Sequence, residues 1–179
     1  MAPVAMWDRL KDQARTLQQT QSGGRGRGSS SGGSRAQLVG LLKSQLASAK
    51  TELKSGAYRD AAMAMCALVA AADGRVEPSE RRRVEELIAT NEVLQNFPPD
   101  QLRKLFNEHV DRLTADFERG RARALEDIAK AAKKPVEARA VVQTGIVVAG
   151  ADGGFEASEQ YAAREACAAL GLSPAEFGI

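Results

Sequence analysis

The chain has 179 residues, of which 44% are hydrophobic, 27% are charged and 4% are aromatic, and its formal net charge is +2. This length suffices for one sizeable helical core but is too short for two ordinary domains plus a flexible segment. Helix-favouring residues dominate, β-branched residues do not alternate over the length of a strand, and no run of about eighteen apolar residues occurs, which argues against a sheet protein and against a membrane span.

Residues 1–19 predict a short amphipathic helix, whose apolar stripe has the form that docks on a partner or a bilayer, although the sequence does not say what it contacts. Charged residues interrupt this segment, which excludes the apolar core of a signal peptide. Residues 20–35 contain no apolar side chain and are rich in Gly, Ser and Arg, so we expect a flexible linker. The apolar stripe of the first segment consists of Val4, Trp7, Leu10, Ala14 and Leu17.

The positive charge is concentrated near the N-terminus. Residues 1–57 carry nine Lys or Arg against three acids, and the remainder carries sixteen against twenty. Two interpretations stay open: a weak contact of this basic tail with an anionic membrane surface, and an ordinary solvated tail. The RGRG stretch has no interleaved aromatic residue, so we expect no specific nucleic-acid partner.

Residues 36–179 predict one compact all-helical domain. A leucine stripe opens it, and two nearly all-apolar helices indicate a buried centre. The expected fold is an all-α bundle of about seven helices with an internal pseudo-twofold duplication, preceded by the flexible N-terminal tail. The expected helices are a first one over Leu38–Leu46, then 58–72, 78–89, 100–117, a run after Gly120, 135–150, and a last one through Leu170 with Gly171 as its C-cap.

An internal repeat carries the candidate chemistry. Residues 69–86 (VAAADGRVEPSERRRVEE) and 148–165 (VAGADGGFEASEQYAARE) are identical at half of their aligned positions. Each copy has an apolar helix, then Asp-Gly, then Glu at four and seven residues after the Asp, then a second helix. This pattern indicates an internal duplication.

Each repeat gathers three carboxylates on one short turn. The Gly after each Asp turns the chain, and the two Glu residues lie three apart at the start of a helix, so they share a face. Such like charges repel one another unless a hard divalent cation with oxygen ligands neutralises them. The candidate metal ligands are Asp73, Glu77 and Glu80 in the first loop, and Asp152, Glu156 and Glu159 in the second.

A second interpretation needs no metal. Glu77 would be an N-cap, Pro78 the first helical residue and Glu80 the third residue of a capping box. Glutamate is a poor N-cap, however, and both loops use it. Arg75 and the arginines at 81–83 place positive charge beside the first loop, so we expect the second loop to bind a cation more tightly. Neither loop follows the EF-hand spacing.

The chain resembles the TerB family of tellurite-resistance proteins. The resemblance lies in the ADGRVEPSE and ADGGFEASE loops, the apolar helix before each, and the terminal LGLSPAEFGI, over about residues 50–179. It implies an all-helical bundle with divalent-cation sites at the acidic loops, and it matches the six carboxylates by position. The family commonly has Ser or Asp at the positions of Glu77 and Glu156.

The resemblance also implies a role and partners. Calcium is the expected cation, with magnesium or manganese as alternatives. The expected function is that of a non-enzymatic adaptor in tellurite resistance and stress response, together with other Ter proteins and a TerC-like membrane protein. The alternative is a metal-free helical interaction module whose acids are helix caps. We expect a cytoplasmic protein, held at the inner face of the membrane through its partner.

His109, Cys66 and Cys167 lie on apolar helix faces, where we expect packing rather than catalysis. The chain has no second histidine, no CxxC pair and none of the common phosphate-loop or hydrolase motifs. Because tellurite reacts with thiols, a detoxifying enzyme that acts through Cys66 and Cys167 is a third hypothesis. The isolated cysteines are typical of a reducing cytoplasm.

Overall fold

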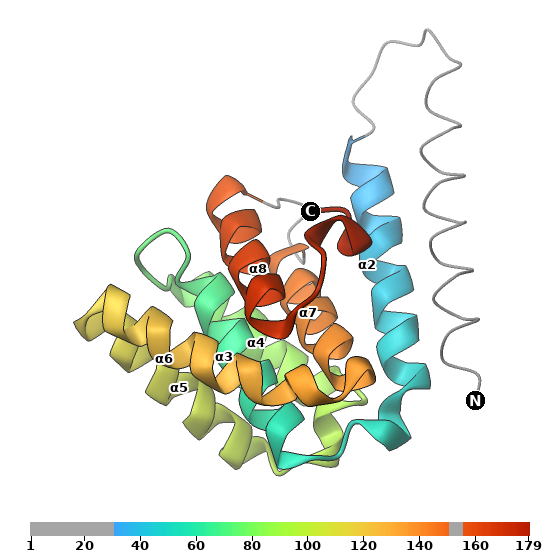
Figure 1. Cartoon of the computed structure of the whole chain (residues 1–179), viewed down its shortest axis with the longest axis horizontal. Coiled ribbons are helices and arrows are strands. Elements are labelled where there is room, and N and C mark those ends of the chain that lie inside the picture. The colour runs from blue at the N-terminus through green and yellow to red at the C-terminus, as the bar shows by residue number, and fades with distance from the viewer. Residues whose placement is uncertain (1–30, 151–155) are drawn as a thin grey trace, which may run out of the picture. The chain divides into compact units, whose positions relative to one another are not determined.

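A computed structural model describes residues 31–150 and 156–179 of the chain (Figure 1). Over these ranges the regular secondary structure is helical and no strand occurs, which confirms the predicted all-α bundle. The α-helices are α2 (Ser31–Ser48), α3 (Gly56–Ala70), α4 (Pro78–Thr90), α5 (Pro99–Ala115), α6 (Phe117–Ala129), α7 (Pro135–Ala149) and α8 (Ala157–Leu170), with short 3-10 helices η2 (Lys50–Glu52), η3 (Leu94–Asn96), η4 (Lys130–Lys133) and η6 (Pro174–Phe177).

Helices α3 and α7 form the centre of the core (Figure 1). Every residue from Ala61 to Ala70 and from Ala140 to Ala149 is buried, as their nearly all-apolar sequences predict. Small residues let these helices approach closely: a Cβ added at Gly145 would collide with Met65 Cε. Helices α5, α6 and α8 pack around α3, so α3 contacts most of the domain.

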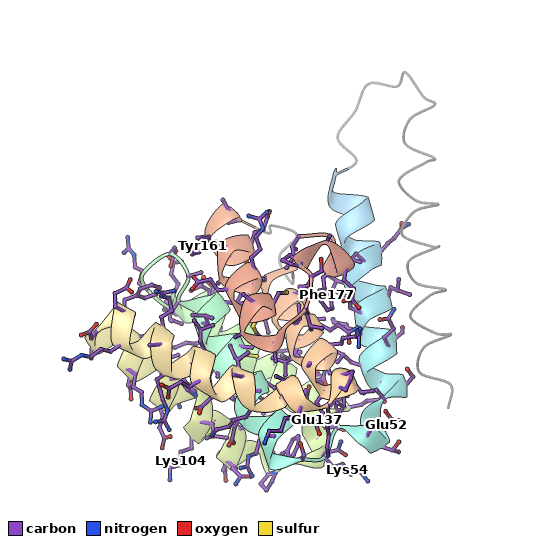
Figure 2. The ribbon with its side chains drawn as sticks, in the orientation of Figure 1. Glu52, Lys54, Lys104, Glu137, Tyr161 and Phe177 are labelled. Atoms are coloured by element: carbon purple, nitrogen blue, oxygen red, sulfur yellow. The ribbon has the colours of Figure 1, made fainter. Side chains whose placement is uncertain are left out.

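Polar groups join the start of α3 to α7. Ser55 Oγ donates to Glu137 Oε1 at 2.7 Å, and the Tyr58 hydroxyl lies 3.1 Å from Thr144 Oγ1. Glu137 is only 3% exposed and lies at the end of the bundle that also carries Lys54 (Figure 2). Because a buried carboxylate without partners is costly, these contacts fix how α3 and α7 align.

The helix ends follow local sequence signals. Ser55 caps α3 by accepting from the Tyr58 N–H, and proline occupies the first turn of α4, α5 and α7. Gly171 ends α8 with a φ of +71°, in the left-handed region that favours glycine. The predicted starts at Pro78 and Pro135 and the predicted C-cap at Gly171 are therefore confirmed.

The expected boundary near Gly120 is wrong. Helix α5 ends at Ala115, Asp116 joins it to α6, and Gly120 lies inside α6. A Cβ at Gly120 would lie 2.6 Å from the Cα of Leu113. Glycine is present because the two helices approach closely there, and not because the chain turns.

The first helix also begins earlier than expected, at Ser31 instead of Ala36, so residues 31–35 of the expected linker belong to α2. The predicted helix over 1–19, the rest of the linker and residues 151–155 of the second loop lie outside the described residues. The internal duplication therefore stays a prediction. No helix in the described ranges is long and apolar enough to cross a membrane.

Candidate functional site

The first acidic loop begins with a tight turn at Asp73. The Asp73 carboxylate accepts a hydrogen bond from the Arg75 N–H at 3.2 Å, and Gly74 has a φ of +98°. The Gly74 N–H donates to the carbonyl of Ala71 at 2.9 Å. Glycine is favoured at this φ because other residues are strained there. The turn reverses the chain after α3 and leaves Asp73 exposed beside it.

Glu77 and Glu80 lie at the start of α4. Glu77 is the N-cap, and its backbone N–H donates to Glu80 Oε2 at 2.8 Å. Pro78 follows as the first helical residue. This hydrogen bond is the Glu80 half of a capping box, as the metal-free interpretation predicts. One oxygen of Glu80 therefore already has a structural role.

The charges of Asp73 and Glu77 act on the third carboxylate of this loop, that of Glu80. Partial burial of Glu80 raises the pKa of its carboxyl group, and the charges of Asp73 and Glu77 raise this pKa further. The Glu77 N–H and Arg83 act in the opposite direction. Nevertheless, in the part of the chain that the structure describes, no three acidic, histidine or cysteine side chains are grouped closely enough to hold a metal ion. The loop concentrates negative charge without forming a completed cluster.

The second loop enters its helix in the same way. Glu156 is the N-cap of α8 with φ −69° and ψ 160°, close to the −76° and 156° of Glu77. Glu159 is the third residue of α8, and its Oε2 is shielded from solvent. Asp152 lies outside the described residues. Of the six predicted ligands, the structure therefore places Glu77, Glu80, Glu156 and Glu159 at equivalent helix starts and Asp73 in the turn after α3, and it does not describe Asp152.

A family model described as "Tellurite resistance protein TerB" matches residues 59–179. The chain belongs to the TerB family. The matched region begins in α3 and includes both acidic loops, whereas α2 lies before it. Searches of the curated proteins and of the solved structures gave no match.

An apolar pocket of about 240 Å³ lies beside the first loop of this TerB domain. Ala72, two residues after the end of α3, and Ser158 at the start of α8 both line it, so the first loop begins next to the helix that follows the second loop. Tyr161 lines the pocket and is 62% exposed (Figure 2). Arg121 pairs with Glu165 in its wall.

Sequence reasoning missed this pocket because its residues come from three helices that only the fold brings together. One signal was available in the sequence. Tyr161 is the one aromatic residue of an alanine-rich helix, and it comes two residues after Glu159, the last acid of the loop. An exposed tyrosine in such a position is typical of a contact surface.

The cysteine side chains are buried in the TerB domain. Cys66 and Cys167 are both 0% exposed. Burial raises the pKa of the Cys66 thiol to about 12 and that of the Cys167 thiol to about 11, and the charge of Glu176 contributes at Cys167. Because the thiolate is the nucleophile, both groups are in poor environments for thiol chemistry. Their burial agrees with the predicted packing role.

His109 is also buried, at 2% exposure. Its Nε2 lies 3.0 Å from Asp127 Oδ2, and its Nδ1 has no hydrogen-bond partner among the described residues. Asp127 in turn contacts Lys130 at 3.0 Å and Arg123 at 3.7 Å. Burial lowers the pKa of His109, although the charge of Asp127 raises it. The pair therefore links α5 to α6 inside the core.

Proposed function

We propose that this TerB-family chain is a non-enzymatic adaptor of tellurite resistance that binds a divalent cation, calcium by preference, at its acidic loops. The observation that carries the proposal is the Glu80 carboxylate, which is partly buried and has a pKa raised by burial and by the adjacent charges of Asp73 and Glu77. A divalent cation at this point would relieve the repulsion of all three carboxylates. Calcium suits such a site because it accepts many oxygen ligands in flexible geometries.

The residues of the first loop fit a cation in part. One oxygen of Glu80 accepts from the Glu77 N–H and one oxygen of Asp73 accepts from the Arg75 N–H, but each carboxylate has a second oxygen. Glu77 is exposed at the same helix start. Because these side chains are not grouped as they stand, we expect cation binding to rearrange the exposed part of the loop. We propose Glu156 and Glu159, together with Asp152, as the equivalent ligands of the second loop.

The alternative function is a metal-free interaction module. The 2.8 Å hydrogen bond from the Glu77 N–H to Glu80 favours this alternative. The capping contact alone explains why a glutamate is present at position 80, without any ion. The two functions differ in what the charge of Glu80 does. Capping needs only an acceptor oxygen, whereas cation binding needs the negative charge.

Glu80→Gln separates the two functions, because the amide keeps an acceptor oxygen and loses the charge. Calcium, magnesium and manganese are titrated by calorimetry into chelator-treated wild-type and variant chains. Cation binding predicts at least a tenfold loss of affinity at this loop, with the melting temperature of the cation-free chain maintained. Glu92→Gln, an exposed carboxylate beyond the end of α4, is the matched control. Equal affinity in Glu80→Gln and wild type would assign Glu80 to capping.

The adaptor role needs a partner surface, and Tyr161 beside the first loop supplies a candidate. We propose that it contacts a TerC-like membrane protein or another Ter protein, at the cytoplasmic face of the membrane. A weak contact of the basic N-terminal tail with anionic lipid would assist. Co-purification of the co-expressed TerC-like protein should fall with Tyr161→Ala and increase with calcium. Recovery that is independent of both would contradict this assignment.

A further inference from the structure

The pocket at Tyr161 lies where three helices meet, and we call it the Tyr161 pocket. Helices α3, α6 and α8 each pack against the other two, and residues of all three line it. Leu68 of α3 and Ala162 of α8 are buried and form its floor. Phe117 at the start of α6 is half-buried in its wall, and Tyr161 is largely exposed (Figure 2). Because packed helices hold these side chains, the pocket is preformed.

The size of the Tyr161 pocket restricts what can occupy it. Sites for cofactors and drug-sized molecules usually have volumes of about 300–1,000 Å³. The Tyr161 pocket, at about 240 Å³, lies below that range and suits one large apolar side chain. Its two aromatic residues, Phe117 and Tyr161, are typical of a protein contact in which a single anchor side chain is buried. The size and lining therefore favour a side chain of a partner protein over a small molecule.

The charged side chains of the pocket wall carry more negative than positive charge. Arg121 pairs with Glu165, which also lines the pocket, and with Glu118, whose carboxylate lies 3.1 Å from the guanidinium. Two carboxylates therefore share one cation, and one negative charge is in excess. The Glu118 side chain is 77% exposed, so it can reach a second partner at the mouth of the pocket. A basic residue beside the anchor side chain would complement this charge.

We propose that the Tyr161 pocket binds a segment of a partner protein in which a large apolar residue lies next to a lysine or arginine. The apolar side chain enters the pocket beside Tyr161, and its basic neighbour pairs with Glu118. An acidic neighbour would be repelled by Glu118 and Glu165. The proposal rests on the adaptor role proposed above and names the chemistry that its partner must present. It does not need a cation, because neither Glu118 nor Glu165 is a candidate cation ligand.

A random-peptide phage library tests the proposal without knowledge of the partner. The library is depleted on the Tyr161→Ala chain and then selected on the immobilised wild-type chain, both in EDTA. We expect the recovered peptides to share Phe, Leu, Met or Trp next to Lys or Arg. One recovered peptide is labelled, and its affinity is measured by fluorescence anisotropy. Tyr161→Ala should lower this affinity at least about tenfold, whereas Tyr161→Phe, which keeps the ring, should change it little.

Glu118→Gln tests the charge. It should lower the affinity of the same peptide about threefold at low salt, and this difference should vanish at high salt, because an exposed ion pair is weak and is screened. Glu126→Gln is the matched control, since Glu126 is an exposed carboxylate of the same helix that does not line the pocket. Equal affinities in the two variants at low salt would overturn the basic half of the motif.

Three further results would overturn the proposal: recovered peptides that are acidic, no peptide whose binding requires Tyr161, and a wild-type dimer that Tyr161→Ala converts to a monomer. The last would identify a second copy of the chain as the occupant. Because the selection contains EDTA, its outcome is independent of the calcium titration. If the selection fails while Tyr161→Ala still reduces co-purification of the TerC-like protein, the adaptor role stands and only the proposed motif is wrong.

Discussion

His109 Nε2 lies 3.0 Å from Asp127 Oδ2 in the buried contact between α5 and α6. Burial lowers the pKa of this imidazole in the folded chain below its ordinary value of about 6.5. The unfolded chain therefore binds a proton more readily than the folded chain as the pH falls below this value. The contribution of His109 to stability is complete above about pH 6.5 and is lost as the pH falls towards the folded pKa.

His109→Gln should remove this dependence, because glutamine does not titrate. We expect the wild-type urea midpoint to fall between about pH 7 and pH 5, and the midpoint of the variant to fall less over the same interval. The variant will be less stable at pH 8, so the comparison concerns how steeply the urea midpoint changes with pH and not the midpoint itself. Equal slopes in the two chains would show that His109 does not cause the pH dependence of stability.

Gly120→Ala should destabilise the domain by about 1–3 kcal/mol, because the new Cβ would meet the backbone of Leu113 at 2.6 Å and the helices must separate. Gly40→Ala is the matched control within a helix, because nothing lies within 4 Å of its Cβ. At position 40 the higher helix propensity of alanine should increase the free energy of unfolding by as much as about 1 kcal/mol. Urea unfolding measures the change in stability of each variant. Equal changes at the two glycines would contradict the packing explanation.

Ser55→Ala should cost about 2–3 kcal/mol, because it removes the N-cap of α3 and the 2.7 Å partner of the buried Glu137 together. Ser48→Ala serves as the control, since that exposed hydroxyl contacts only a carbonyl of its own helix. Thermal unfolding of the three chains gives the comparison. A loss at Ser55 no larger than that at Ser48 would mean that Glu137 is satisfied without this contact.

Both thiols should react slowly in the folded chain. With pKa values raised to about 12 and about 11 and with side chains that are fully buried, Cys66 and Cys167 should be alkylated at pH 8 only as the chain opens. Mass spectrometry with iodoacetamide, with and without urea, measures this. Rapid labelling of either cysteine in native buffer would revive the thiol-enzyme hypothesis, and Cys66→Ala with Cys167→Ala would then be tested for tellurite protection.

Local signals explain which parts of the fold could be predicted. Pro78, Pro135 and Gly171 act on their own neighbours, through a fixed φ or a left-handed cap, so their effects are visible in the sequence. Gly120 does not mark a helix boundary, because its role depends on the backbone of Leu113 across a helix contact, which the local sequence does not show. A sequence shows that a glycine is present, but only the fold shows whether it is needed for a turn or for close packing.

At the candidate site, too, the local contacts could be predicted and the contacts between helices could not. The spacing of Glu77 and Glu80 correctly predicted a capping contact, because both residues belong to one turn of helix. The raised pKa of Glu80 depends on how deeply α4 is buried, and the pocket at Tyr161 depends on α3, α6 and α8 together. Neither follows from spacing. Cation binding itself stays a prediction from the sequence and the family.

The central claim is that the acidic loops bind a divalent cation, and calorimetric titration of calcium into chelator-treated protein tests it most directly. The wild-type chain should show saturable heat and an increased melting temperature. Asp73→Ala should remove the weaker binding event and Asp152→Ala the tighter one, because arginines adjoin only the first loop. Absence of heat and of thermal stabilisation in the wild-type chain would contradict the claim and return these carboxylates to helix capping.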